Sequence, residues 1–90
     1  MCLGIPGQVV EIVDAGQHLA KVDVSGLRRV ISVRLVADQS LGAGDWVLVH
    51  VGFAMAKIDE TEARLTLAAM EKLGQAYLDE IEAFDSSAIA

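Results

Sequence analysis

Short runs of β-branched residues, separated by turn signals, occupy the first 58 residues of this chain. In the run Ala20–Val24 (AKVDV), apolar and charged side chains alternate, which is the period of a strand with one buried and one solvated face. Ser25-Gly26 supplies a turn directly after it. We predict strands at residues 8–13, 18–24, 27–36, 45–52 and 53–58. Short strands at such close spacing favour a small, closed or nearly closed β-barrel.

The period of the apolar residues changes at Asp59. Asp59 and Glu62 have the spacing of a capping box, and apolar residues then recur at helical spacing as far as Ile81. Gly74 interrupts this seam, so the helix bends or ends there. We predict a mainly β protein with a C-terminal α-helix: a small OB-like barrel (an SH3-like barrel is the alternative) over residues 1–58, one packed helix over 59–84, and a loose tail over 85–90.

Composition excludes several classes of protein. The net charge of −6 argues against phosphate binding, and aromatic residues make up only 4% of the chain. A nucleic-acid-binding OB module needs a basic groove and stacking aromatics, so this alternative is disfavoured. The sequence has neither the pattern of a signal peptide nor an apolar stretch of the roughly 20 residues that a membrane span needs. We therefore expect a soluble, cytoplasmic protein that does not bind membranes or nucleic acid.

The single cysteine, Cys2, is followed closely by Gly4, Pro6 and Gly7. Its position alone leaves two interpretations open, a small terminal side chain without a role or a reactive thiol. The glycines and the proline restrict and shape the backbone around it, which favours the second. If Met1 is removed, the new ammonium group next to the thiol favours the thiolate, the form that attacks and binds metals.

His50 lies in the most apolar run of the chain, residues 45–52. The local sequence leaves open a histidine that is bonded to the backbone in the core or at the barrel mouth. It also allows a metal ligand or proton acceptor that Gly52 places at a strand end. Phe53 and Met55 follow directly, and in so small a barrel they predict an exposed apolar patch.

One cysteine and one usable histidine are too few for a closed zinc site, which takes four ligands. Two ligands suit a transient metal site whose remaining ligands come from a partner or from the cargo. A thiol enzyme, with Cys2 as nucleophile and His50 as base, is the alternative. That enzyme lacks a local signature for the group that orients the base.

Four segments carry a resemblance to a known family: MCLGIPGQV, VDVSGLRR, DWVLVHVGFAM and IDETEA. Their register, from Met1 to about Leu73, is similar to that of the HypC/HupF/HybG family of hydrogenase assembly chaperones. The first and third segments are the specific ones, whereas the sequence after Gly74 is not diagnostic.

The resemblance implies a non-enzymatic chaperone, without catalytic residues, on an OB-type barrel with a C-terminal helix. Its expected partners are the HypD scaffold protein and the precursor of the [NiFe]-hydrogenase large subunit. Its expected cargo is iron carrying cyanide and carbonyl ligands, bound transiently.

The family's essential cysteine corresponds to Cys2 and its histidine to His50, so we expect these two residues to bind iron that is shared with a partner. Some relatives have a second cysteine where this chain has Ser25, which leaves Cys2 as the only thiol ligand here. We expect the partner-binding surface to include six residues: Cys2, Gly4, Pro6, Gly7, Phe53 and Met55.

Overall fold

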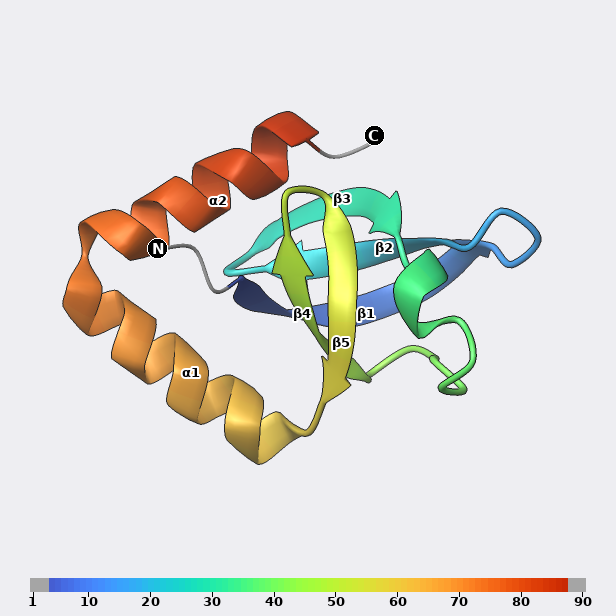
Figure 1. Ribbon diagram of the computed structural model, residues 1–90, viewed down its shortest axis with the longest axis horizontal. Coiled ribbons are helices and arrows are strands. Elements are labelled where there is room, and N and C mark those ends of the chain that lie inside the picture. Colours follow the sequence, from blue (N-terminus) through green and yellow to red (C-terminus); the bar gives the residue numbers. More distant parts are fainter. Residues whose placement is uncertain (1–3, 88–90) are drawn as a thin grey trace.

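The computed structural model describes residues 4–87, apart from the side chains of Ala76 and Ser87, and consists of a β-barrel followed by two helices (Figure 1). The predicted mainly β class and OB-like barrel are confirmed. The elements in chain order are β1 (Ile5–Asp14), β2 (Leu19–Val24), β3 (Leu27–Ser32), the 3₁₀ turn η1 (Arg34–Val36), β4 (Trp46–His50), β5 (Phe53–Ile58), α1 (Glu60–Leu73) and α2 (Gln75–Ser87).

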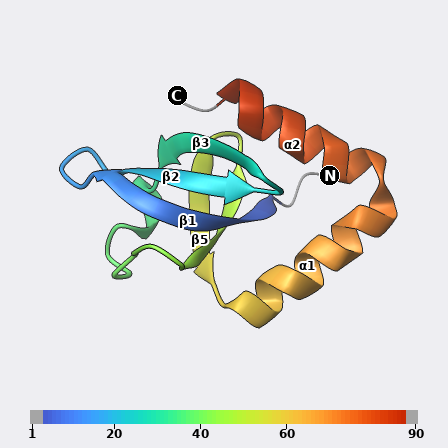
Figure 2. The ribbon, with the colours of Figure 1, turned by 180° about the vertical axis from the view of Figure 1, so that it is seen from behind.

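The barrel closes in the strand order β1-β2-β3-β5-β4, with β1 pairing antiparallel to both β2 and β4. The junction between β3 and β5 is parallel and consists of a single residue pair, Ser32↔Phe53. Figure 2 shows the wall that β1, β2 and β3 form on the side seen from behind. In the β1–β4 pair, Ile5 lies opposite Val49, so the N-terminal end of β1 meets the C-terminal end of β4.

The core is almost entirely aliphatic, as the low aromatic content requires. The alternation in β2 is confirmed, because every second side chain of that strand is fully buried. One aromatic ring, that of Phe84 on α2, is 1% exposed and joins the core from outside the barrel. The core cluster comprises Ile5, Val9, Ala20, Val22, Val24, Ile31, Val33, Val36, Val47, Val49, Ala54, Met70 and Phe84.

Two of the predicted strands differ from the structure by three or more residues at one end, whereas β2 and β4 are only slightly shorter than predicted. β1 begins at Ile5 rather than at residue 8, because the segment before residue 8 pairs with β4. The strand predicted over 27–36 ends at Ser32, and η1 follows it. Val33 and Val36 are buried in this turn. The apolar run therefore continues past the strand because these side chains join the core. The spacing of apolar residues alone could not distinguish a longer strand from a strand followed by a buried turn.

The first helix begins where its capping box predicts, since the Glu62 N–H donates to Asp59 Oδ1 at 2.7 Å. It ends at Gly74, whose φ of +63° ends the helix and starts the reversal that leads into α2. The chain then returns toward the barrel as α2, so the C-terminal part is a helical hairpin rather than one helix (Figure 1).

The expectation of a loose tail over 85–90 is wrong for residues 85–87, which continue α2. Two contacts explain why the last turn of the helix stays folded. Phe84 is buried in the core, and Asp85 Oδ1 lies 2.7 Å from Arg29 Nη2 on β3. Residues 88–90 lie outside the described part of the chain.

Gly7 is held in the barrel wall by close packing. A Cβ atom at this position would lie 2.6 Å from Val22 Cγ1 and 2.9 Å from Val24 Cγ2, two side chains that are fully buried. We expect Gly7→Ala to lower the free energy of unfolding by about 1–3 kcal/mol, since branched core side chains must move to admit the methyl group. The matched control is Gly42→Ala, where a Cβ would meet nothing within 4 Å. Denaturant titration measures both variants, and equal midpoints for the two would contradict the prediction.

Candidate functional site

His50 lies at the end of β4, on the outer face of the barrel. The residues that alternate with it, Val47 and Val49, are fully buried, whereas the His50 side chain is 32% exposed. The chain reverses directly after it through Val51 and Gly52, with φ angles of +51° and +81°. The sequence allowed two interpretations of His50, a core histidine or an accessible ligand. The structure shows an intermediate case, in which His50 is partly buried and part of its ring is accessible.

The charged group nearest to His50 is the carboxylate of Glu80, on α2. Glu80 is 3% exposed, and its Oε1 lies 3.6 Å from His50 Nδ1. Neither His50 Nδ1 nor Glu80 Oε2 has a hydrogen-bond partner among the described residues. The sequence patterns did not point to Glu80. Its helical spacing from Tyr77 and Phe84, which both pack on the barrel, is the signal that could have revealed a buried carboxylate.

The described chain begins beside the same end of β4. Gly4 precedes Ile5, the partner of Val49, and its φ is +88°. A Cβ on Gly4 would lie 2.9 Å from the Val49 carbonyl oxygen and 3.0 Å from Leu48 Cγ. Any residue other than glycine would therefore push the N-terminal segment away from β4. Cys2 lies outside the described residues, and Gly4, the first described residue, packs against Val49, the neighbour of His50 in β4.

Apart from Cys2, which lies outside the described residues, the residues predicted to bind partners fall into two structural groups. Gly4, Pro6 and Gly7 are buried at the start of the barrel wall, where they shape the backbone instead of presenting a surface. Phe53 and Met55 lie on β5 and are 51% and 39% exposed. Partner contact by the first group stays a prediction, and the second group supplies the exposed side chains of the candidate surface.

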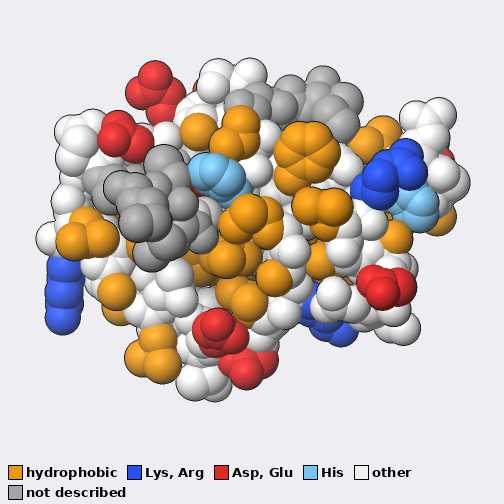
Figure 3. Space-filling model, viewed as in Figure 1, with side chains coloured by type: hydrophobic (Ala, Val, Ile, Leu, Met, Phe, Trp, Pro, Cys, Tyr) orange, Lys and Arg blue, Asp and Glu red, His pale blue; other side chains and the backbone are white. Residues whose placement is uncertain are grey.

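We define the β4–β5 apolar face as Val51, Phe53 and Met55. All three are exposed, and Met55 Cε reaches to within 3.3 Å of the position that a Gly4 Cβ would occupy. Figure 3 shows hydrophobic side chains gathered in the middle of the side where β4 and β5 lie. The face therefore adjoins Gly4, the first described residue.

Within residues 4–87 there is no group of three or more His, Cys, Asp and Glu side chains that could hold a metal ion. A metal bound at His50 would consequently need ligands from Cys2, from a partner or from its own small ligands. The helices of this part of the chain include none that is long and apolar enough to cross a membrane.

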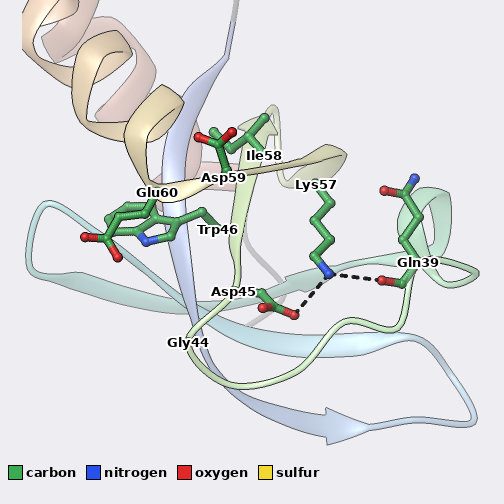
Figure 4. Close-up of a pocket in the computed structure, with 8 residues that line it drawn as sticks. All are labelled: Gln39, Gly44, Asp45, Trp46, Lys57, Ile58, Asp59 and Glu60. Carbon is green, nitrogen blue, oxygen red and sulfur yellow. Dashed lines mark hydrogen bonds and ion pairs between the residues drawn. The ribbon is translucent and has the colours of Figure 1, made fainter.

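An open hollow lies at the opposite end of β4, near Trp46 (Figure 4). Lys57 Nζ crosses it, donating to the Gln39 carbonyl oxygen at 3.2 Å and lying 3.6 Å from Asp45 Oδ2. Asp45 also accepts a hydrogen bond from the Gly42 N–H at 2.8 Å. The polar groups of Lys57, Gln39, Asp45 and Gly42 therefore pair with one another. The hollow is separate from His50, so it takes no part in the predicted site.

Residues 4–87 define a small protein of the OB-like barrel class, in which a helical hairpin packs against the strand end that carries an accessible histidine. Comparison with known families makes the assignment specific, because the model of the HupF/HypC family matches residues 1–70. The chain belongs to this family, and the resemblance seen in the sequence is confirmed.

Named relatives agree with this assignment. The chain is 55% identical over 78 residues to the hydrogenase maturation factor HypC of Rhodobacter capsulatus, covering 84% of this chain and 81% of that protein. It is 44% identical over 75 residues to the hydrogenase maturation factor HybG of Escherichia coli K12, covering 81% and 92%. It is also 46% identical over 86 residues to frd operon uncharacterized protein C of Proteus vulgaris, covering 93% and 88%.

Proposed function

We propose that this protein is a non-enzymatic chaperone of [NiFe]-hydrogenase maturation, which holds an iron centre as cargo together with a partner protein. Family membership and the names of the relatives support the general role. The single structural observation that carries the proposal is the packing of Gly4 against Leu48 and Val49, at the end of β4 that carries His50.

Chain length limits how far the thiol can lie from the histidine. Gly4 is fixed against Leu48 and Val49 by contacts that leave no room for a Cβ atom. Only one residue separates Gly4 from Cys2, and an extended chain spans at most about 3.6 Å per residue. The Cys2 Cα is thus tethered within roughly 7 Å of the Gly4 Cα, which supports joint action of Cys2 and His50.

The chemistry of the two side chains suits iron that is passed on rather than kept. A thiolate and an imidazole are both good ligands for iron, but two protein ligands leave most of the coordination shell open. In this proposal the open positions belong to cyanide, carbonyl and a ligand from the partner. A site with so few ligands of its own can release its cargo without unfolding.

The proposed partners are a HypD-type scaffold protein and the precursor of the hydrogenase large subunit. The β4–β5 apolar face is our candidate contact surface, because it is exposed and adjoins Gly4. The net charge of −6 is compatible with protein partners and unfavourable for nucleic acid.

Purification of the tagged protein from hydrogenase-producing cells tests the proposal. We expect both partners to copurify, with iron in the complex and infrared bands of bound cyanide and carbonyl. Phe53→Ser and Met55→Ser should each lower the recovered partner by about 10-fold, which corresponds to about 1.4 kcal/mol of binding free energy. The matched control is Leu65→Ser on α1, since Leu65 is 68% exposed and lies outside the β4–β5 apolar face. Recovery of neither partner nor iron with the wild-type protein would refute the proposed function.

A further inference from the structure

We propose that Glu80 is a positioning residue for His50, in that its carboxylate accepts a hydrogen bond from Nδ1–H and thereby leaves the lone pair of Nε2 free to bind a metal. The assignment of iron as that metal rests on the proposed function. The orientation of the ring does not, because it follows from groups within this chain. Glu80 lies beyond residues 1–70, the part matched by the family model.

Burial and distance single out this pair. Glu80 is the one buried charged residue in the described part of the chain, and at 3% exposure its carboxylate has almost no access to water. A buried carboxylate requires a donor or a cation nearby, since desolvation otherwise disfavours it strongly. Its partner at ion-pair distance is His50, with Nδ1 3.6 Å from Oε1. A shortening by about 0.6 Å would make this contact a good hydrogen bond.

The helix that carries Glu80 is fixed on the barrel on both sides of it. Before Glu80, the Tyr77 hydroxyl lies 2.6 Å from Ser25 Oγ in the β2–β3 turn. After it, Phe84 is buried in the core and Asp85 pairs with Arg29. The carboxylate is therefore presented to His50 by a rigid element.

The position of Glu80 determines which tautomer a neutral His50 imidazole adopts in this proposal. One ring nitrogen then carries a proton and donates, and the other carries a lone pair and accepts. An ionised carboxylate only accepts, so Glu80 selects the tautomer protonated at Nδ1. Histidines that bind metals commonly donate their other N–H to a carboxylate, which fixes the ring and raises the basicity of the ligand.

A purely structural ion pair, which only holds α2 on the barrel, is the competing explanation. Both explanations expect some loss of stability when Glu80 is replaced, so stability cannot separate them. The tautomer of His50 can, and ¹⁵N–¹H correlation spectra of the side chains report it directly. The chain has two histidines, and His18 serves as an internal reference because it lies on the β1–β2 loop, far from α2.

The spectra are recorded on the purified protein, well above the ordinary imidazole pKa of about 6.5. We expect His50 of the wild type to be protonated at Nδ1. Glu80→Gln should keep this tautomer, because its amide oxygen still accepts, whereas Glu80→Met should shift His50 toward protonation at Nε2. The control Glu82→Met, at an exposed position of the same helix, should leave His50 unchanged. Protonation at Nε2 in the wild type would overturn the proposal without any variant, and so would an unchanged tautomer in folded Glu80→Met.

Iron content provides the functional readout. Loss of a carboxylate that orients a metal-binding histidine typically costs about 10–100-fold in affinity or activity. We expect Glu80→Met to lose iron from the copurified complex by about this factor per folded protein, and Glu80→Gln to lose less. Wild-type levels of iron in Glu80→Met would contradict the positioning role. A wild-type complex without iron would contradict the proposed function, while the tautomer result would still stand.

Discussion

Cys2→Ala should abolish hydrogenase maturation while leaving the thermal unfolding of the protein unchanged. Cys2 precedes β1, and the core cluster of the described residues is formed by later positions, so we expect its side chain to contribute little to stability. The Cys2 thiolate, in contrast, is the only thiolate ligand that the sequence offers to iron. Hydrogenase activity in cells that produce the variant, together with a thermal melt of the purified protein, measures both expectations.

Cys2→Ser is the sharper companion variant, because it keeps a small polar side chain and removes only the sulfur. We expect it to fail in maturation like Cys2→Ala. Wild-type maturation by either variant would end the hypothesis that Cys2 binds the iron. A fall in melting temperature that explains the lost activity would assign the thiol to folding instead.

His50→Ala should lower both maturation and the iron content of the complex by about 10-fold or more, because removal of a ligand costs at least as much as removal of a residue that orients it. The structure adds a second expectation. Loss of the imidazole leaves the buried Glu80 carboxylate without its partner, so the free energy of unfolding should fall by about 1–3 kcal/mol. Iron must therefore be measured per folded protein, alongside a thermal melt of the same samples.

The double variant separates the two roles of His50. If Cys2 and His50 bind one iron, Cys2→Ala combined with His50→Ala should retain as much iron per folded complex as Cys2→Ala alone. Independent roles would give losses that multiply. A large drop in melting temperature of His50→Ala with unchanged iron per folded complex would identify His50 as a structural residue.

Local patterns predicted much of the fold because the interactions behind them are local. The alternation in β2 depends on which side of one strand is buried, and the start of α1 depends on a hydrogen bond between two residues three positions apart. β5 has the predicted bounds, 53–58. For the site, the sequence supplied the residue types and the family, and hence Cys2 and His50 as the ligands to test.

Tertiary structure alone decided the features that depend on residues distant in sequence. Gly74 predicted a break but could not predict that α2 returns to the barrel, because the contacts that hold it there come from Ser25, Arg29 and the core. Whether the run after Ser32 continues as a strand depends likewise on where its apolar side chains find the core. The pairing of Glu80 with His50 is the clearest case. A buried carboxylate is tolerable only beside a suitable donor, and the donor is brought to it by the closure of the barrel and the reversal of the helical hairpin, neither of which any local pattern encodes.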